Sequence, residues 1–281
     1  MLLICDSGST KADWILAENG NIIGEYNTPG INPYFHNQET IIASIHKSEE
    51  LVEQSKKIKT IHFFGAGCSS VERIKIVHDA LGIIFLNANI DVQHDLLCSA
   101  FATCGDNPGI ACILGTGSNS CYFDGKKIIE NNHGIGYILG DEGSGSYYGR
   151  KLLSNFIYNR LPENIYQNLA KRHHLTKEII IENVYSKPNA NVYLASFAKV
   201  LYEHKEEEFV KHLVEKGMKE FFENYVITIP EHQDVPVHFV GSIAHFFNDI
   251  LSNVAVIYGC KLGKVIRRPI SGLFDYYRSE S

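Results

Sequence analysis

The sequence predicts an α/β fold made of two halves that share one plan. The chain opens with the apolar run Leu2–Cys5, which ends on Asp6 and is followed by a Ser/Gly/Thr turn and a second apolar run. Residues 109–123 repeat this order, and each half then continues with helix-like and strand-like segments. An internal repeat constrains the fold more strongly than any single motif does.

The first repeat has the features of a phosphate-binding hairpin. Asn19-Gly20 predicts a type I′ turn between a strand over residues 14–17 and a strand at Ile22-Ile23. The turn around Gly8 gathers backbone N–H groups and small hydroxyls, which suits a phosphate group. Asp6 beside it can hold Mg²⁺, directly or through water. On this stretch alone, an ordinary hairpin with a polar turn is an equally good interpretation.

The second repeat strengthens the phosphate interpretation. The apolar run over residues 109–114 ends in a Gly/Ser/Thr turn, and a second strand leads to a tight turn at Asp124-Gly125. Ile128-Ile129 then matches Ile22-Ile23 of the first half. Two such turns facing each other could grip a polyphosphate from both sides.

Composition narrows the class of protein. The 281 residues are 44% hydrophobic and 21% charged, as in ordinary globular proteins, and suffice for one large or two medium domains. The net charge of −6 and the lack of an extended basic patch argue against nucleic acid as a partner. Apolar runs are strand-sized, so we expect no membrane-spanning helix.

Cysteine and histidine usage argues against a zinc site and against metalloprotease chemistry. The seven cysteines are scattered and mostly lie in apolar runs, which predicts reduced core residues of a cytoplasmic protein. Met1 leads straight into a strand, so no signal peptide is expected. No CxxC pair and no HExxH motif occurs, so zinc-site and metalloprotease chemistry are not expected.

Hydrophobic periodicity assigns the remaining elements. In the first half we expect helices over residues 38–54, from a Ser69/Glu72 capping box to about Leu81, and from Asp95 to Cys104. Strands are expected over residues 60–64, 83–86 and 90–92. In the second half we expect helices over residues 151–229, 243–256 and 270–277, with strands over residues 236–242 and 261–266. The last helix is expected to pack back on the first half.

Two polar residues of the first half are candidates for a functional role. Asp95 follows a strand, and ligands of open α/β sheets lie at the carboxyl ends of strands, so its carboxylate could accept a hydroxyl proton. By sequence alone a helix N-cap is the commoner role for such an Asp, and the two roles are not exclusive. Asn32 lies in a loop fixed by Pro29, Gly30 and Pro33, and its amide could bind sugar hydroxyls or serve as a turn residue.

Glycines mark the domain boundary and two further loops. Residues 105–109 are turn formers just before the repeat restarts. Residues 131–146 contain five glycines and adjacent acids, which predicts a functional loop. Gly241-Ser242 ends a buried strand and would let a flat ring approach the backbone. Neither a dinucleotide GxGxxG motif nor a Walker A motif is present.

Taken together, these features resemble the actin/hexokinase/Hsp70 superfamily, and within it the N-acetylglucosamine kinase group of the BadF/BadG-type ATPases. The resemblance covers essentially the whole chain. Residues 6–11 look like the first phosphate motif, residues 114–119 like the second, and residues 240–242 like the adenosine motif. Residues 134–144 resemble the sugar-side loop and are the most specific match.

The resemblance implies a role for individual residues. Asp95 matches the catalytic base that takes the proton of a sugar 6-hydroxyl. The ATP- and phosphate-binding positions are Asp6, Gly8, Ser9, Thr10, Lys11, Gly115, Thr116, Gly117, Gly241 and Ser242. The substrate-binding positions are Asn32, Asp95, Ser118, Asn119, Gly134, Ile135, Gly136, Tyr137 and Asp141. Asp6 is the expected Mg²⁺ ligand.

One departure from the family pattern affects which sugar is expected as the substrate. Position 135 is Ile where the mammalian-type enzymes carry an aromatic residue, which removes a stacking surface and could widen the pocket. The implied reaction is Mg²⁺- and ATP-dependent phosphorylation of N-acetylglucosamine, N-acetylmuramic acid or both. Family likeness also suggests a homodimer.

The implied architecture is two ribonuclease-H-like domains with a cleft between them. The N-terminal domain, on the sugar and phosphate side, takes residues 1–107 and 268–281, and the C-terminal domain, on the nucleotide side, takes residues 108–267. Two alternatives stay open: an iron–sulfur activator of radical dehydratases from the same ATPase family, and a non-catalytic sugar sensor. The absence of Cys between Cys121 and Cys260 argues against the activator.

Overall fold

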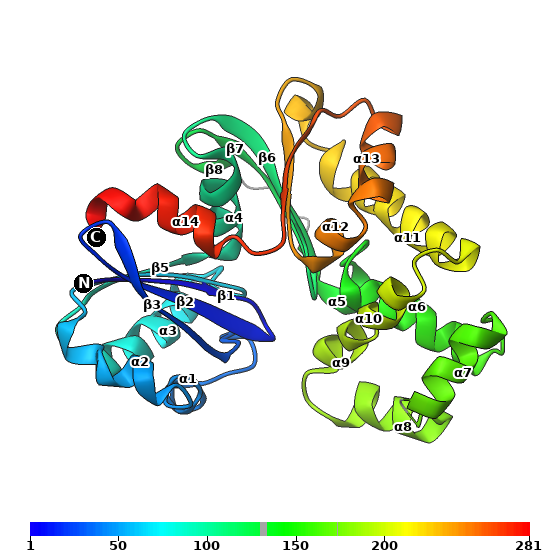
Figure 1. Cartoon of the computed structure of the whole chain (residues 1–281), viewed down its shortest axis with the longest axis horizontal. Helices are drawn as coiled ribbons and strands as arrows, with labels where there is room; N and C mark the ends of the chain where they lie inside the picture. The colour runs from blue at the N-terminus through cyan, green and yellow to red at the C-terminus, as the bar shows by residue number, and fades with distance from the viewer. Residues whose placement is uncertain (130–133, 173) are drawn as a thin grey trace. The chain divides into compact units, whose positions relative to one another are not determined.

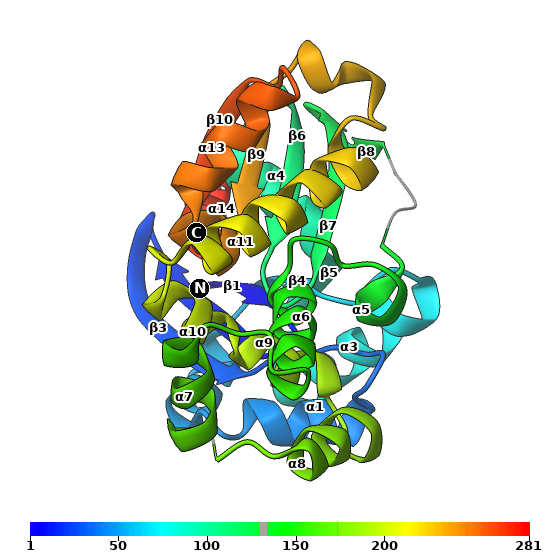
Figure 2. The same cartoon turned by 90° about the vertical axis from the view of Figure 1, so that its right-hand side faces the viewer.

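The chain divides into two compact units. The structure, a computed structural model, describes residues 1–129, 134–172 and 174–281, so residues 131–133 of the predicted Gly-rich loop lie outside the described residues. The N-terminal unit comprises Met1–Asn107 and Arg268–Ser281, and the C-terminal unit comprises Pro108–Arg267. Figures 1 and 2 show both units in two views.

The N-terminal unit, whose residues are all described, is built on a mixed five-stranded sheet in the order β3-β2-β1-β4-β5. Its strands are β1 (Leu2–Ser7), β2 (Lys11–Glu18), β3 (Asn21–Pro29), β4 (Thr60–Gly65) and β5 (Asn89–His94). The first three strands pair antiparallel, whereas β4 pairs parallel with both β1 and β5. Asn19 and Gly20 both have positive φ, at 50° and 75°, which confirms the predicted type I′ turn.

Helices cover both faces of this sheet (Figure 1). They are α1 (Gln38–Ile45), α2 (Glu49–Glu53), α3 (Val71–Ile84), α4 (Asp95–Cys104) and α14 (Ile270–Tyr277), with 3₁₀ turns η1 (Ser55–Lys57) and η5 (Arg278–Glu280). Leu3 and Cys5 of β1 face the core shared with α1 and α3, whereas Leu2 and Ile4 face α14. Because β1 is covered on both sides, it reads as a continuous apolar run. The predicted packing of the last helix on the first half is confirmed.

The C-terminal unit repeats this sheet plan. In its described part the strand order is β10-β9-β6-β7-β8, again with three antiparallel strands in sequence and two parallel additions. The strands are β6 (Pro108–Leu114), β7 (Ser118–Asp124), β8 (Ile128–Ile129), β9 (Val237–Val240) and β10 (Leu262–Ile266). The internal repeat predicted from sequence is therefore confirmed as a repeated topology.

A helical segment lies between β8 and β9, and further helices follow β9 (Figure 2). The helices are α5 (Gly136–Leu139), α6 (Gly145–Ile157), α7 (Glu163–Arg172), α8 (Lys177–Ile181), α9 (Ala190–Ser196), α10 (Ala198–Glu203), α11 (Glu208–Phe221), α12 (Ser242–Phe246) and α13 (Asn248–Ile257). The other helical turns are two π-helical turns, η2 (Glu182–Ser186) and η3 (Phe222–Val226), and one 3₁₀ turn, η4 (Pro230–Gln233).

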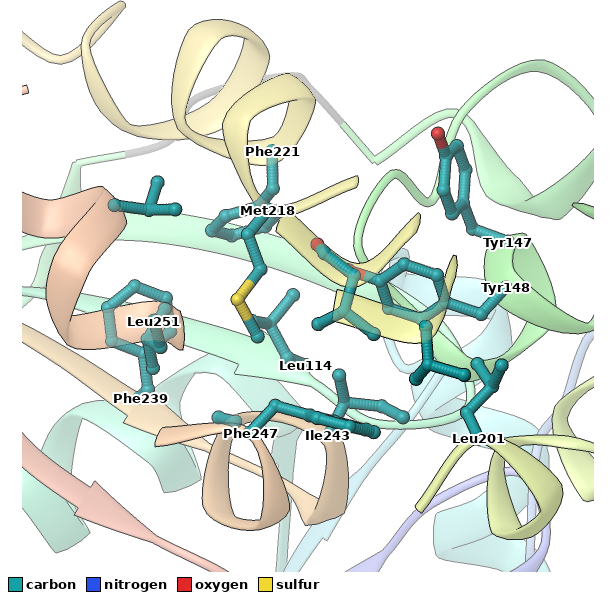
Figure 3. Close-up of a cluster of buried hydrophobic side chains, with 14 of the residues drawn as sticks. Leu114, Tyr147, Tyr148, Leu201, Met218, Phe221, Phe239, Ile243, Phe247 and Leu251 are labelled. Atoms are coloured by element: carbon teal, nitrogen blue, oxygen red, sulfur yellow. The ribbon is translucent and has the colours of Figure 1, made fainter. Parts of the chain in front are cut away.

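The core of the C-terminal unit joins its sheet to these helices. Figure 3 shows Leu114 of β6 and Phe239 of β9 in one cluster with Met218 and Phe221 of α11. Tyr148 of α6 is fully buried in the same cluster. Because Leu114 is the last residue of β6, this packing fixes the start of the second phosphate-type turn.

Three predicted elements are wrong, and two of them lie in the N-terminal unit. The helix over residues 38–54 is two helices, because the His46 ring bonds the Ile42 carbonyl (2.9 Å) where α1 ends, and Glu49 and Glu50 favour a new helix start. The strand over residues 83–86 overlaps the last turn of α3, since a short apolar run does not by itself distinguish strand from helix.

The helix over residues 243–256 is also two helices. Phe247 interrupts it with non-helical backbone (φ −116°, ψ 33°), and its side chain is buried in the core. A smaller correction concerns α3, whose N-cap is Ser70 rather than Ser69: the Ser70 hydroxyl accepts the Arg73 N–H.

Candidate active site

The first phosphate-type turn follows β1 and is braced by the loop after β3. The Gly8 N–H donates to the carbonyl of Lys11 (3.0 Å), which closes the turn. Gly30 packs against the turn so closely that a Cβ atom there would overlap the Gly8 carbonyl oxygen. The Ser7 hydroxyl accepts the Ile31 N–H (2.8 Å), so two loops fix the shape of this turn.

Asn32 ties this loop to the phosphate-type turn through its side chain. Its Nδ2 donates to the Ser9 hydroxyl (3.0 Å), and its Oδ1 accepts the Tyr34 N–H (3.0 Å). The residue is buried. A carboxamide has two N–H donors and two oxygen lone pairs, so these two bonds use half of its hydrogen-bonding capacity. Asn32 is thus the turn residue that one interpretation predicted, and it lies beside the phosphate-type turn.

Three carboxylates gather at the end of β1. Asp6 lies opposite Asp13 in the β1–β2 register, and it is close enough to Asp95 for the two charges to interact. Burial, followed by the charges of Asp95 and Asp13, raises the pKa of Asp6 to about 7. Lys11 forms an ion pair with Asp13 (2.6 Å), so the ammonium group that was expected to bind phosphate has a carboxylate partner.

Asp95 behaves differently from Asp6 because of its neighbours. It is the first residue of α4, and the N-cap is His94, so the N-cap interpretation of Asp95 is wrong. His94 Nδ1 lies 2.9 Å from Asp95 Oδ1 and 3.1 Å from the Leu96 nitrogen. Burial opposes ionisation of Asp95, but His94 and the backbone N–H groups of Leu96 and Asp95 outweigh it and lower the pKa of Asp95. Of the two facing carboxyls, Asp95 therefore ionises first.

The second phosphate-type turn is held by the start of α6. The N–H groups of Gly145 and Ser146 donate to the carbonyls of Gly115 (2.8 Å) and Thr116 (3.0 Å). Within the turn, the Gly115 N–H donates to the Gly117 carbonyl (3.0 Å). Because its carbonyls face α6, the turn has a fixed backbone shape.

Asp141 links the predicted sugar-side loop to this turn. Its Oδ1 accepts the Ser118 N–H (3.3 Å), and the Ser118 hydroxyl donates to the Glu142 carbonyl (2.8 Å). Asp141 is almost completely buried and has left-handed backbone (φ 58°), which is uncommon outside glycine. Its carboxylate also packs against Gly117, where an added Cβ would lie 2.9 Å from Oδ2.

The rest of the sugar-side loop is more exposed. Gly134, Ile135 and Gly136 are exposed, and Tyr137 is half-buried. Arg150 of α6 donates to the carbonyls of Tyr137 (3.2 Å) and Ile138 (2.9 Å), which anchors α5. Gly134 packs against the Asn119 side chain, whose Oδ1 accepts the Ser120 N–H (2.9 Å).

The predicted adenosine motif lies against the same turn. Gly241 has φ of 123°, and a Cβ there would overlap the Leu114 carbonyl, so only glycine fits this close approach. Ser242 starts α12 and is exposed. Within the C-terminal unit the structure therefore brings residues 115–119, 134–142 and 241–242 together.

The expected site residues thus form two separate clusters, one in each unit. The first cluster contains Asp6, residues 8–11, Asn32 and Asp95. The second contains residues 115–119, residues 134–137, Asp141, Gly241 and Ser242. Among the described residues of both, no three His, Cys, Asp or Glu side chains are arranged to enclose a metal ion. No helix in the described part of the chain has the length and apolar character needed to cross a bilayer.

Sequence reasoning missed three residues of these two clusters. Asp13 could have been found from the hairpin register, since it lies directly opposite Asp6. His94 precedes the singled-out Asp95 and could have been examined with it. Tyr225, whose hydroxyl accepts the Asp141 N–H (3.1 Å), lies 84 positions further along the chain and has no local sequence signal.

Comparison with known proteins identifies similar structures. No protein-family model matches the chain, and no curated protein matches it. A proposed N-acetylglucosamine kinase from Porphyromonas gingivalis shares 38% identity with a TM-score of 0.94, and the match covers 99% of each chain.

More distant structures share the fold. A proposed N-acetylglucosamine kinase from Chromobacterium violaceum is 15% identical, with a TM-score of 0.63 over 98% of each chain. A ROK-family glucokinase from Streptomyces griseus, solved with glucose and AMPPNP, is 15% identical with a TM-score of 0.58, over 98% of this chain and 97% of that one. The fold is therefore the actin-like ATPase fold of sugar kinases.

Proposed function

The chain belongs to the N-acetylglucosamine kinase-like family of actin-like ATPases, and from this membership we propose that it transfers the γ-phosphoryl group of ATP to the 6-hydroxyl of an N-acetylated amino sugar. The observation that carries the proposal is that each unit holds one rigid phosphate-type turn and that the N-terminal unit also holds an ionised carboxylate, Asp95, beside its turn. Phosphoryl transfer depends mainly on positioning and charge stabilisation, which such a set of groups supplies.

The phosphate groups of ATP are assigned to the two turns. Thr10 and Thr116 carry hydroxyls that can bind phosphate oxygens, whereas the N–H groups of Gly8 and Gly115 close the turns themselves. Gly241-Ser242 is assigned to the adenosine part of ATP, since Gly241 packs directly on the second turn. The domain roles follow: the N-terminal unit serves the sugar and phosphate side, and the C-terminal unit serves the nucleotide side.

Mg²⁺ is assigned to Asp6. Burial, followed by the charges of Asp95 and Asp13, raises the pKa of Asp6 to about 7, and a divalent cation would compensate the negative charge gathered there. The residues present therefore fit the ion, with Asp6 as a direct or water-mediated ligand and Asp13 nearby. Bound there, Mg²⁺ supplies charge neutralisation of the phosphate oxygens.

Asp95 is assigned the role of catalytic base. His94 and the start of α4 keep its carboxylate ionised, so it can accept the hydroxyl proton as the O–P bond forms. The sugar itself is assigned to Asn32, Ser118, Asn119, the loop over residues 134–137 and Asp141. Exposed Ile135 offers no aromatic stacking surface, so both N-acetylglucosamine and the bulkier N-acetylmuramic acid are candidate substrates.

The activator alternative requires accessible thiolates to hold a cluster between subunits. All seven cysteines are buried, and burial raises the pKa of Cys5, Cys68 and Cys98 near the acidic cluster. We therefore prefer the kinase. A non-catalytic sugar sensor would bind the sugar without ATP turnover, so an activity assay distinguishes it from the kinase.

The test measures ADP release with Mg·ATP against N-acetylglucosamine, N-acetylmuramic acid, N-acetylmannosamine, glucose and no sugar. Turnover that depends on an N-acetylated sugar is the expected result. Asp95→Asn should lower kcat by roughly 10³-fold or more, since a positioned base contributes on the order of 10²–10⁴. ATP hydrolysis indifferent to every sugar, or no turnover at all, would contradict the proposal.

Asp91→Asn is the matched control. Asp91 lies on β5, the strand that leads to Asp95, but its carboxylate faces His62 (3.5 Å) rather than Asp6. The same change of acid to amide there should leave kcat within about threefold, because a surface ion pair affects stability modestly. Equal losses in both variants would mean that the Asp95 effect is structural.

A further inference from the structure

Tyr225 occupies a well-defined place next to the predicted sugar-side loop. It lies in η3, directly after α11, and its ring stacks on Phe221 with centroids 4.9 Å apart. Its backbone carbonyl accepts the Ser120 hydroxyl of β7 (2.7 Å). The residue is buried, so both its ring and its backbone are fixed to rigid elements of the C-terminal unit.

The hydroxyl of Tyr225 lies in the bend of the loop. It accepts the Asp141 N–H (3.1 Å), and a Cβ placed on Gly140 would lie 3.0 Å from it. Burial, followed by the charge of Glu142, raises the pKa of Tyr225, so the phenol keeps its proton and can donate to the Glu142 carboxylate. One hydroxyl thus serves two consecutive residues of the loop, as acceptor and as donor.

The residue it holds has an uncommon backbone. Asp141 is left-handed, a conformation that a non-glycine residue keeps only when its surroundings enforce it. On its other side, the Asp141 carboxylate accepts the Ser118 N–H of the second phosphate-type turn. Asp141 is therefore held from two directions, by Tyr225 through its backbone and by Ser118 through its carboxylate.

We propose that Tyr225 is a positioning residue for substrate binding: its hydroxyl fixes Asp141 and thereby sets the loop over residues 134–142 against the second phosphate-type turn. The proposal rests on the assignment of this loop to the sugar. The turn keeps its own bonds to Gly145 and Ser146, so loss of the Tyr225 hydroxyl should affect the sugar more than ATP.

Tyr225→Phe removes only the hydroxyl and keeps the stacked ring. Tyr148→Phe is the matched control, because Tyr148 is equally buried in the same core and its hydroxyl donates to the Val214 carbonyl (2.8 Å), away from the loop. Tyr148→Phe loses one buried hydrogen bond, Tyr225→Phe loses the bonds to Asp141 and Glu142, and both variants are expected to fold. Their folding is checked by thermal denaturation before any comparison.

The first readout is amide hydrogen exchange in the ligand-free full chain. The Asp141 amide should exchange roughly tenfold faster in Tyr225→Phe, because it loses its acceptor, and at the wild-type rate in Tyr148→Phe. This readout does not depend on catalysis. Unchanged exchange at Asp141 in Tyr225→Phe would overturn the positioning role.

The second readout is steady-state kinetics with N-acetylglucosamine and ATP, with calorimetric titration of the sugar alongside. In Tyr225→Phe the KM and Kd for the sugar should rise roughly tenfold, and the KM for ATP should stay within about twofold. Faster exchange with unchanged sugar affinity would overturn the link to the sugar. If wild type neither binds nor phosphorylates the sugar, the proposed function fails, while the exchange experiment still decides whether Tyr225 positions Asp141.

Discussion

His238 should make the C-terminal unit sensitive to acid. This histidine lies in β9, an interior strand between β10 and β6, and it is buried. Its Nδ1 accepts the Lys264 N–H of β10 (2.9 Å), so the folded protein holds the neutral ring. Burial, followed by the charge of Lys264, lowers the pKa of His238 from 6.5 to about 4.

The magnitude follows from linkage. Between about pH 6.5 and pH 4 the unfolded chain binds a proton at His238 that the folded protein rejects, so the free energy of unfolding falls as pH falls. At about pH 4.5 the loss relative to neutral pH is about 2.5 kcal/mol, from about 1.4 kcal/mol for each pKa unit. That is a large share of the 5–15 kcal/mol typical of domains.

The assay compares urea unfolding at about pH 7 and about pH 4.5 in wild type and His238→Asn. Asparagine keeps an acceptor near the Nδ1 position and does not titrate, so carboxylate effects cancel between the two proteins. The variant should be less stable at neutral pH, because it leaves a cavity, yet lose about 2.5 kcal/mol less on acidification. Equal pH dependence in both proteins would refute the reasoning.

Two further predictions concern the N-terminal unit. Burial lowers the pKa of His62, but the carboxylates of Asp91, 3.5 Å from Nδ1, and Glu280, hydrogen-bonded to Nε2 at 2.9 Å, outweigh it and leave that pKa raised. The stabilisation is present below about pH 6.5 and is lost as pH rises through the folded pKa, so His62→Gln should destabilise more at about pH 6 than at about pH 8.5 in urea unfolding; a constant difference would contradict it. Asn32→Asp keeps the acceptor for Tyr34, removes the donor to Ser9 and adds a charge beside a phosphate-type turn. The KM for ATP should rise roughly tenfold in steady-state kinetics, and an unchanged KM would argue against ATP at that turn.

The repeated hairpins could be predicted from sequence because their signals are local. Asn19-Gly20 specifies a type I′ turn, and buried strands read as apolar runs. The helix breaks at residues 46–48 and at Phe247 could not be predicted. The first depends on a hydrogen bond between the His46 ring and the end of α1, and the second on burial of the Phe247 ring in the core. Periodicity detects the apolar face of a helix, but it does not register a short interruption that preserves that face.

The site residues divide in the same way. Asp6 and the two turns could be predicted from local sequence motifs. The pKa difference between Asp6 and Asp95 could not, because it depends on His94 and on the start of α4. Tyr225 reaches Asp141 across 84 positions, a contact that only the tertiary fold creates. Sequence reasoning therefore finds candidate binding groups that lie in local motifs, and it largely misses the groups that position them.

The two turns share one sequence plan but differ in what braces them. In the N-terminal unit the brace is the loop over residues 30–32, which packs on the turn and places the Asn32 amide on Ser9. In the C-terminal unit the brace is the start of α6, whose N–H groups bind the carbonyls of Gly115 and Thr116. A repeat alone would give two equivalent phosphate sites. The unequal braces make the two turns different: the first has a buried carboxamide and the Asp6 carboxyl as neighbours, whereas the second has the start of a helix. The two turns are therefore not expected to bind phosphate in the same way.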